Sequence, residues 1–235
     1  NDYWDYKRGI DIATKRTKFS GGTGVLPENL LKPRTVYLAG LVFLILGAAI
    51  GSYFIAIRGV TIAIILGFAV IAIYFYSTRI VNAGLGELFV AIKGAMIVLG
   101  TLYVQNAVLE PTALYVGAIV GILSATVLFI NSFPDYEADK SKGRRTLVII
   151  LGKEVASTTF PMFIIAAYAL IAGGIFFGLT KVYCLISFVS IPLAVKSALS
   201  LRKHPQSIDN IVPAMASTVT YSRITGFLLA LSYIL

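Results

Sequence analysis

Two short acidic segments hold the residues of this chain that are best suited to chemistry. The first is NDYWDYKRGID, residues 1–11, and the second is NSFPDYEADKSKGRRT, residues 131–146. Six of the eleven acidic residues of the chain lie in them: Asp2, Asp5, Asp11, Asp135, Glu137 and Asp139. Carboxylates gathered so densely repel one another unless a cation neutralises them. Mg²⁺ is the usual partner, because it binds carboxylate oxygens together with the phosphate groups of a substrate.

The spacing within each segment places its acids on one face of a helix. Asp5 lies three residues after Asp2 and four after Asn1, and Asp139 lies four residues after Asp135. Cations that could hold the phosphate oxygens left free by a metal follow both groups: Lys7, Arg8, Lys140, Lys142, Arg144 and Arg145. A single cluster of this kind could equally form exposed salt bridges, which stabilise a protein little. Two similarly spaced clusters favour a shared site.

The rest of the chain has the composition of a membrane-embedded helical bundle. Of its 235 residues, 57% are hydrophobic and only 13% are charged, unlike a soluble domain of this size. Apolar stretches long enough to span a bilayer predict seven transmembrane helices: residues 36–57, 59–77, 86–108, 112–131, 156–178, 180–200 and 213–235. The expected fold is an all-α, polytopic transmembrane helical bundle. Cys184 and His204 are single residues of their types, which excludes a disulfide framework and disfavours a cysteine or histidine metal site.

The distribution of positive charge orients the predicted helices. Four spans separate the two acidic segments, and an even number of spans returns both segments to one side. Sixteen of the 20 Lys and Arg residues lie on that side, whereas only Arg58 and Lys181 lie on the other. The positive-inside rule makes the first side cytoplasmic, so we expect a multi-pass protein of the cell membrane whose acidic site faces the cytoplasm. Topology and anionic lipid explain the net charge of +9, and no soluble domain supports nucleic-acid binding.

The two acidic segments resemble motifs of the UbiA superfamily of intramembrane aromatic prenyltransferases. The first is similar to the family motif N-D-x-x-D in its longer form N-D-Y-x-D-x-x-x-G-x-D, and the second is similar to D-x-x-x-D followed by K-G-R-R-T. Between them, YSTRIVNAGLGELFV at residues 76–90 resembles the stretch after the fourth helix of the family. The family has nine transmembrane helices in a bundle around a central cavity, and its first motif lies near the end of helix two. The resemblance therefore implies that residues 1–235 form a single domain without helix one and most of helix two.

The resemblance implies Mg²⁺-dependent transfer of a prenyl group from a prenyl diphosphate to a lipophilic or aromatic acceptor, with release of pyrophosphate. It assigns the metal to five residues: Asn1, Asp2, Asp5, Asp135 and Asp139. Among these, Asp5, Asp135 and Asp139 are also expected to be catalytic, together with Tyr76 at the motif end of a predicted span. Substrate-binding roles are expected for a further group: Asp11, Lys7, Arg8, Ser77, Glu87, Lys93, Lys142 and Arg145.

Several of these assignments have structural alternatives. Glu87 and Lys93 are ionisable residues within a predicted span, where such residues usually serve function. We expect Lys93 to reach the cavity, toward the diphosphate, although either residue could instead link helices and Glu87 could lie at the membrane interface. Tyr76 could belong to an interfacial aromatic belt. FSGGTGVLPEN at residues 19–29 lacks the lysine and spacing of a phosphate-binding P-loop, and it is expected to be a cytoplasmic loop that could order over a substrate.

The acceptor is the least constrained part of the interpretation. Several branches of the family carry N-R-P after the first motif, whereas this chain has TKRTKFSGGTGVLPEN at residues 14–29. This pattern resembles the menaquinone branch, which prenylates 1,4-dihydroxy-2-naphthoate. The alternative is digeranylgeranylglyceryl phosphate synthase of archaeal ether-lipid synthesis, and a more distant one is a small-ion transporter. Transporters usually place their charged sites near the bilayer midplane, whereas these acids lie at helix ends. Donor length and oligomeric state stay open.

Overall fold

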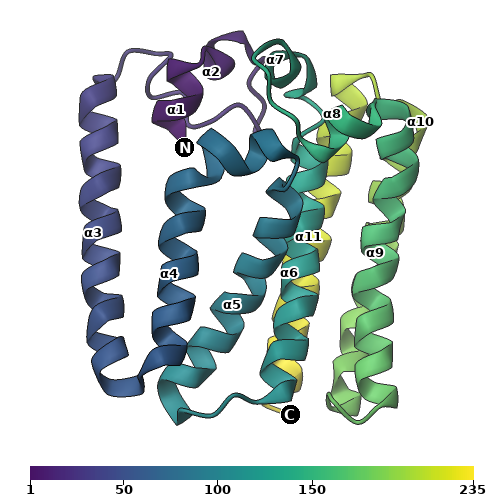
Figure 1. Cartoon of the computed structure of the whole chain (residues 1–235). Coiled ribbons are helices and arrows are strands. Elements are labelled where there is room, and N and C mark those ends of the chain that lie inside the picture. The colour runs from purple at the N-terminus through teal and green to yellow at the C-terminus, as the bar shows by residue number, and fades with distance from the viewer.

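Seven long helical segments run side by side in the computed structural model, which describes all 235 residues (Figure 1). They are α3 (Pro33–Arg58); α4 (Val60–Phe75), continued by the π-helical turn η1 (Tyr76–Ile80) and the 3₁₀ turn η2 (Val81–Ala83); α5 (Gly86–Asn106); α6 (Pro111–Asn131); α9 (Lys153–Phe176); the 3₁₀ segment η3 (Val182–Ser190), continued by α10 (Ile191–Lys203); and α11 (Ile208–Ser232). No β-strand is present. The predicted all-α fold is confirmed.

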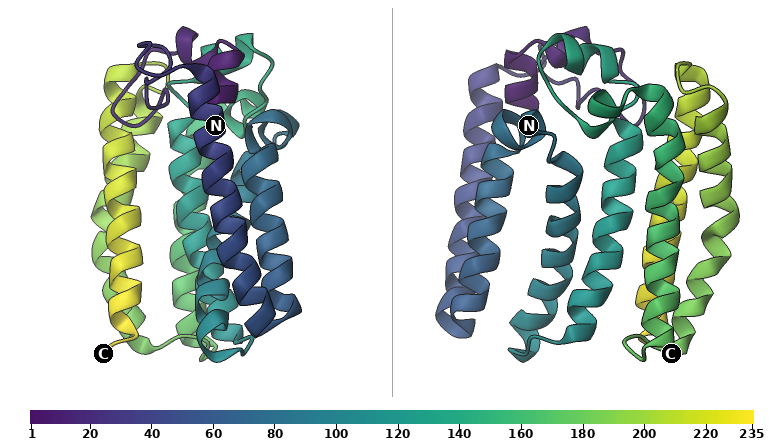
Figure 2. Two further views of the ribbon diagram at one scale, coloured as in Figure 1. Left: turned by 90° about the vertical axis from the view of Figure 1, so that its left-hand side faces the viewer. Right: turned by 45° about the vertical axis from the view of Figure 1, so that its right-hand side comes forward.

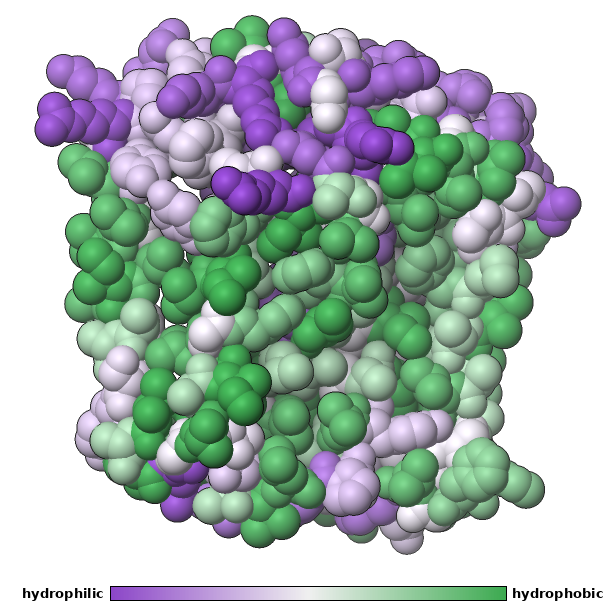
Figure 3. All heavy atoms as spheres, viewed as in Figure 1, coloured by the Kyte–Doolittle hydropathy of each residue, from purple (hydrophilic) through white to green (hydrophobic).

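Four short helices close one end of the bundle: α1 (Asp2–Lys7), α2 (Ile10–Ala13), α7 (Tyr136–Ser141) and α8 (Leu147–Leu151). We call these helices, with the loops at residues 14–32 and 142–146, the cap. Figure 2 shows the cap over one end of the helices from two further directions, whereas the other end carries only short connections. In Figure 3 the helices form a broad apolar band, and hydrophilic residues gather on the cap. This distribution fits a bundle whose middle lies in lipid and whose cap meets water.

The prediction of seven apolar spans requires one correction, at α11. Six of the long helices are apolar enough to cross a membrane, and α11 is not among them, although its 25 residues are sufficient in length. Its composition differs because it carries buried hydroxyl residues: Ser217, Thr218, Thr225 and Ser232. Three of them bond to the neighbouring segment: Thr225 pairs with Ser190 at 2.7 Å, Ser232 pairs with Cys184 at 3.1 Å, and Thr218 pairs with Ser197. Hydrogen bonds of this kind join helices within a membrane.

Helices α5 and α6 approach each other closely because small residues face one another. A Cβ atom on Gly121 would lie 2.2 Å from the carbonyl oxygen of Ala91, and one on Gly94 would lie 2.7 Å from the Cα atom of Gly121. One turn away, a Cβ atom on Gly117 would lie 2.9 Å from the carbonyl oxygen of Ala95. The two backbones therefore pack directly, as small residues allow in membrane helices. This contact joins the first half of the bundle, α3 to α5, to the second half, α6 to α11.

Most of the buried core lies in the second half of the bundle. Phe129, Phe160, Met215 and Tyr221 are fully buried there, from α6, α9 and α11. By contrast, α3 has no buried residue and stands at the edge of the bundle in Figure 1. The first half therefore presents most of its apolar surface outward, and its position depends on the α5–α6 contact and on the cap.

The α5–α6 contact predicts a specific sensitivity to one methyl group. Gly121→Ala places its Cβ atom against the Ala91 backbone, which cannot move aside as a flexible side chain would. We expect a loss of about 1–3 kcal/mol of stability from this overpacking. The measurement is thermal unfolding in detergent, followed by the fluorescence of Trp4, the single tryptophan.

The matched control is Gly67→Ala in α4, where an added Cβ atom would meet nothing within 4 Å. This variant should be as stable as the parent protein or slightly more so, because alanine favours helix. Equal melting temperatures for the two variants would contradict the direct packing of α5 on α6.

Candidate active site

A cavity of about 210 Å³ lies between the cap and the ends of the long helices beneath it. Five acidic residues line it: Asp5, Asp11, Glu87, Asp135 and Asp139. Arg144 is the only Lys or Arg residue that does so. In a chain that has eleven acidic residues and a net charge of +9, this is a marked concentration of negative charge. The structure thus brings the two acidic segments to one place.

The first acidic segment forms two short helices because Gly9 breaks it. Gly9 has a φ of +74°, a left-handed conformation that glycine adopts without steric cost. The chain turns at this residue from α1 into α2. The turn allows Asp5 of α1 and Asp11 of α2 to line the same cavity, where their exposed fractions are 5% and 7%.

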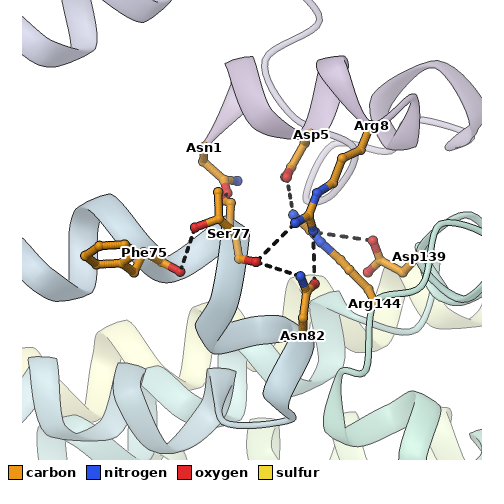
Figure 4. Close-up of polar contacts among 9 residues, drawn as sticks. Asn1, Asp5, Arg8, Phe75, Ser77, Asn82, Asp139 and Arg144 are labelled. Atoms are coloured by element: carbon orange, nitrogen blue, oxygen red, sulfur yellow. Dashed lines mark hydrogen bonds and ion pairs between the residues drawn. The ribbon is translucent and has the colours of Figure 1, made fainter.

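Hydrogen bonds hold α1 against the end of the second long helix. Arg8 donates to the side-chain oxygen of Asn82 at 3.0 Å and to the carbonyl oxygen of Thr78 at 3.1 Å. The hydroxyl group of Ser77 donates to the side-chain oxygen of Asn1. Figure 4 shows these contacts between α1 and the turns that follow α4. Ser77 and Thr78 belong to the π-helical turn η1, a departure from the α-helix that often occurs at functional sites.

Arg144 joins the two acidic segments. Its guanidinium group donates to a carboxylate oxygen of Asp5 and, at 3.2 Å, to a carboxylate oxygen of Asp139 (Figure 4). Asp139 lies in α7 and is only 3% exposed. The turn after α7 returns Arg144 over Asp139, whose carbonyl oxygen accepts a hydrogen bond from the Arg144 backbone at 2.9 Å. Asp11 and Asp135 form no ion pair.

The glycine-rich loop after α2 also lines the cavity. Phe19, Ser20, Gly21 and Gly22 all contribute to the wall. Gly22 has a φ of +68°, and a Cβ atom there would lie 3.1 Å from a carboxylate oxygen of Asp11. The absence of a side chain therefore lets the loop backbone lie close to Asp11. This is the place that a loop ordering over a substrate would occupy.

Burial raises the pKa values of the cavity carboxyl groups, because one arginine cannot compensate all of them. Burial raises the pKa of Asp5 to about 6, against the opposing charge of Arg144. Burial and the charge of Asp5 raise the pKa of Asp11 to about 6. Burial and the charge of Asp139 raise the pKa of Asp135 to about 7. Burial also raises the pKa of Asp139, although Arg144 lowers it. A cation bound beside these four groups would favour their ionised form, because an opposite charge nearby lowers the pKa of a carboxyl group.

The residues that sequence analysis assigned to the site divide into two groups. Seven of them line the cavity: Asn1, Asp5, Asp11, Tyr76, Glu87, Asp135 and Asp139. The others do not. Asp2 accepts a hydrogen bond from Thr23 at 2.5 Å and lies outside the cavity wall, so its position does not support the expected metal-binding role. Lys7 is exposed over the Trp4 ring, at 5.4 Å from its centroid. Arg8 and Ser77 hold α1 in place.

Three lysine and arginine residues lie elsewhere than expected. Lys93 borders a separate groove of about 480 Å³ between α3, α4 and α5. It lies nearly two helical turns beyond Glu87, on the face of α5 toward α4, so it does not lie beside the acids. Lys142 and Arg145 are exposed. Arg144 takes the place that was expected for Arg145, and helical periodicity could not distinguish them because both lie in an irregular turn.

Besides Arg144, five polar residues that were not assigned to the site also line the cavity: Thr14, Ser20, Asn131, Ser132 and Thr146. Asn131 and Ser132 directly follow a long apolar stretch and precede Asp135. That abrupt change from apolar to polar residues is the signal by which the sequence could have indicated them.

The oxygen-rich lining fits a divalent cation that arrives with a phosphate ligand. No group of three or more acidic, histidine or cysteine side chains lies close enough together to hold a metal by itself. Mg²⁺ seldom uses such a cage, because it binds one or two carboxylates together with substrate phosphates and water. One carboxylate oxygen of Asp135 is buried without any hydrogen-bond partner. Hard oxygen ligands are therefore free at this site.

The raised pKa values predict an unusual pH dependence of stability. The folded carboxyl groups of Asp5, Asp11 and Asp135 have pKa values of about 6 to 7, above the ordinary value of 3.8, so they bind protons more tightly than the unfolded chain does. The metal-free protein should therefore become more stable as the pH falls from 8 toward 5. We expect its melting temperature in a chelating buffer to rise by about 5 °C.

Asp135→Asn provides the comparison for this prediction. It removes the group with the highest of the three pKa values, so the variant should melt higher than the parent at pH 8 and respond less to pH. A melting temperature of the parent protein that is constant or falls between pH 8 and pH 5 would contradict the raised values.

Comparison with known proteins shows the family to which the chain belongs. The UbiA prenyltransferase family matches residues 1–217. The 1,4-dihydroxy-2-naphthoate octaprenyltransferase of Bacillus subtilis (strain 168) is 28% identical over 240 residues, which cover 100% of this chain and 75% of that protein. The protein of the same name from Escherichia coli (strain K12) is 26% identical over 138 residues, which cover 59% of this chain and 44% of that protein. No solved structure is similar enough to count as a match. Since the family match includes both acidic segments, the chain belongs to the UbiA prenyltransferase family and is a prenyltransferase.

Proposed function

We propose that this protein transfers a prenyl group from a prenyl diphosphate to a hydroxylated aromatic acceptor, with Mg²⁺ bound to the diphosphate and pyrophosphate released. The observation that carries the proposal is the cavity in which five carboxyl groups and one guanidinium meet at the polar end of an apolar bundle. A diphosphate with bound divalent cations has the charge that this lining requires, and its apolar chain can remain in lipid.

The two acidic segments would share the metal-bound diphosphate. Asp5, Asp135 and Asp139 would hold Mg²⁺ with carboxylate oxygens, and Asn1 adds an amide oxygen to the same cavity. Bound Mg²⁺ would stabilise the negative charge of the diphosphate as it leaves. Arg144 supplies N–H groups that can bind phosphate oxygens in pairs. Its present contacts with Asp5 and Asp139 place it where both segments meet.

The remaining wall of the cavity suits the transfer of a carbocation-like group. The allylic C–O bond breaks with its electron pair going to the diphosphate, and a carbon of the acceptor ring attacks the allylic cation. The ring then regains aromaticity by releasing the proton, or the carboxyl group as CO₂, that the attacked carbon carried. Ile10, Val81 and Leu128 line the cavity with apolar groups, which exclude the water that would otherwise capture the cation. Tyr76 adds an aromatic ring, and such rings stabilise cations.

The matched relatives favour an aromatic acceptor over the alternatives. Both are named for 1,4-dihydroxy-2-naphthoate, which supports that compound and the menaquinone pathway over a glycerol phosphate acceptor of archaeal lipid synthesis. A transporter is disfavoured because the acidic residues lie at one end, under the cap, rather than in the middle of the bundle. The cap and the helix ends beside it carry most of the Lys and Arg residues, which supports the location of this end of the bundle on the cytoplasmic side of the cell membrane.

The proposal predicts that the acidic segments are needed together. Asp5→Asn and Asp139→Asn each remove one charge on opposite sides of Arg144, so each should lower turnover at least about a hundredfold through lost stabilisation of the leaving diphosphate. The assay measures pyrophosphate release from a prenyl diphosphate in the presence of 1,4-dihydroxy-2-naphthoate, with and without Mg²⁺.

Asp209→Asn is the matched control, because Asp209 is exposed in the first turn of α11 and does not line the cavity. It should retain full activity. Activity of both site variants at the level of this control, or full activity in a chelating buffer, would refute the proposed role of the carboxyl groups.

A further inference from the structure

The cavity beneath the cap has two chemically different parts. Asp5, Asp139 and Arg144 form a charged network on the cap side. The other part lies toward the membrane, where Glu87 opens α5 and Asn131 ends α6, beside apolar Leu128. A metal-bound diphosphate suits the first part. The second part is left for a different ligand.

Unsatisfied polar atoms are concentrated in this cavity. Nine buried side-chain oxygen and nitrogen atoms of the protein have no hydrogen-bond partner, and six of them belong to cavity-lining residues. Three of the six lie in the part toward the membrane: both carboxylate oxygens of Glu87 and the side-chain oxygen of Asn131. Buried polar groups in folded proteins are nearly always hydrogen-bonded. Three orphaned oxygens in one cavity therefore indicate a place for a polar ligand.

Glu87 is the strongest of these indications. The residue is only 6% exposed, although it lies in a helix that can cross a membrane. The backbone N–H groups of Glu87 itself and of Leu147 face its carboxyl group but form no hydrogen bond to it. An ionisable group placed at such cost usually serves function.

The three orphaned oxygens also define the chemistry of the ligand. All of them are hydrogen-bond acceptors when Glu87 is ionised, so the ligand must donate. A diphosphate is anionic and offers only acceptors, so it cannot satisfy these oxygens by itself. A hydroxylated aromatic ring offers O–H donors at its edge and apolar faces to Val81 and Leu128.

We propose that Glu87 and Asn131 form the acceptor subsite, where the hydroxyl groups of a dihydroxyarene donate hydrogen bonds to these side chains. This inference rests on the proposed prenyl transfer, and it makes Glu87 a specificity-determining residue. Tyr76 lines the same cavity as Glu87 and Arg144, and its hydroxyl oxygen would lie 3.6 Å from a Cβ atom on Gly86, the residue before Glu87. A ring held beside Tyr76 would therefore lie next to the reactive end of the donor.

Gly86 offers a way to test the space in this subsite independently of Glu87. A Cβ atom on Gly86 would lie 3.6 Å from the hydroxyl oxygen of Tyr76, 3.7 Å from Val81 and 3.8 Å from Leu128. These are ordinary contact distances, so Gly86→Ala would occupy part of the subsite without a clash. Gly86 is in helical conformation, which alanine favours.

The experiment compares acceptor and donor constants for the full chain. Glu87→Gln keeps the shape of the side chain but removes its charge and one acceptor atom. We expect the KM for 1,4-dihydroxy-2-naphthoate and its calorimetric Kd to rise about tenfold or more, while the KM for prenyl diphosphate changes less than about twofold. Gly86→Ala should raise the KM for this bicyclic probe more than that for a monocyclic dihydroxybenzoate.

Glu154→Gln is the matched control, since Glu154 is exposed and bonds only to Gln206, so its constants should equal those of the parent protein. An unchanged Kd of Glu87→Gln for 1,4-dihydroxy-2-naphthoate would overturn the inference. An equal rise of the KM values for acceptor and donor would also overturn it, because it would indicate a structural role of Glu87 at the start of α8. If Glu87→Gln fails to fold, the test rests on Gly86→Ala. An unchanged KM of Gly86→Ala for 1,4-dihydroxy-2-naphthoate would then overturn the proposed acceptor subsite. Failure of the proposed function is distinct: the parent protein would then transfer no prenyl group, whereas probe binding would still depend on Glu87.

Discussion

The structure depends on one imbalance of charge: five carboxyl groups line a cavity that contains a single guanidinium group. Water cannot solvate these carboxyl groups fully, because four of them belong to buried residues. The raised pKa values of the aspartates in the cap express the same constraint, since each proton retained near neutrality avoids a further uncompensated charge. A site built in this way is unfavourable for the empty protein and favourable for a ligand that brings positive charge with it.

The architecture assembles this site from two halves that share few other contacts. The first acidic segment is held by η1 and η2, which continue α4, through Arg8 and Ser77. The second segment follows α6 and belongs to the other half. Only the close packing of α5 on α6 joins the halves along their length, and Arg144 joins them within the cap. Neither half contains a complete site.

Sequence reasoning predicted the parts of the structure that depend on composition and counting. Apolar stretches predicted the long helices, and an even number of spans placed Asp5 and Asp139 on one side. It was less successful where a side chain's direction depends on packing. Lys93 lies on the α4 side of α5, which no span count can predict, and Arg144 rather than Arg145 enters the cavity because an irregular turn has no fixed period. The hydroxyl residues of α11 lower its mean hydropathy. Their hydrogen-bond partners lie on α10 and η3, so a local stretch of the sequence could not show that these hydroxyl groups are paired inside the bundle.

Arg144 has a consequence for how such a protein can be made. A chain inserted into a membrane completes its helices before any substrate has bound, and two facing groups of carboxylates would then hold its cap apart. Because Arg144 belongs to the chain itself, it is present at synthesis and pairs with Asp5 and Asp139 from opposite halves at once. The cap can close around this built-in counter-ion. The first substrate to arrive then brings its own cations into a finished enclosure, rather than organising loose segments around itself.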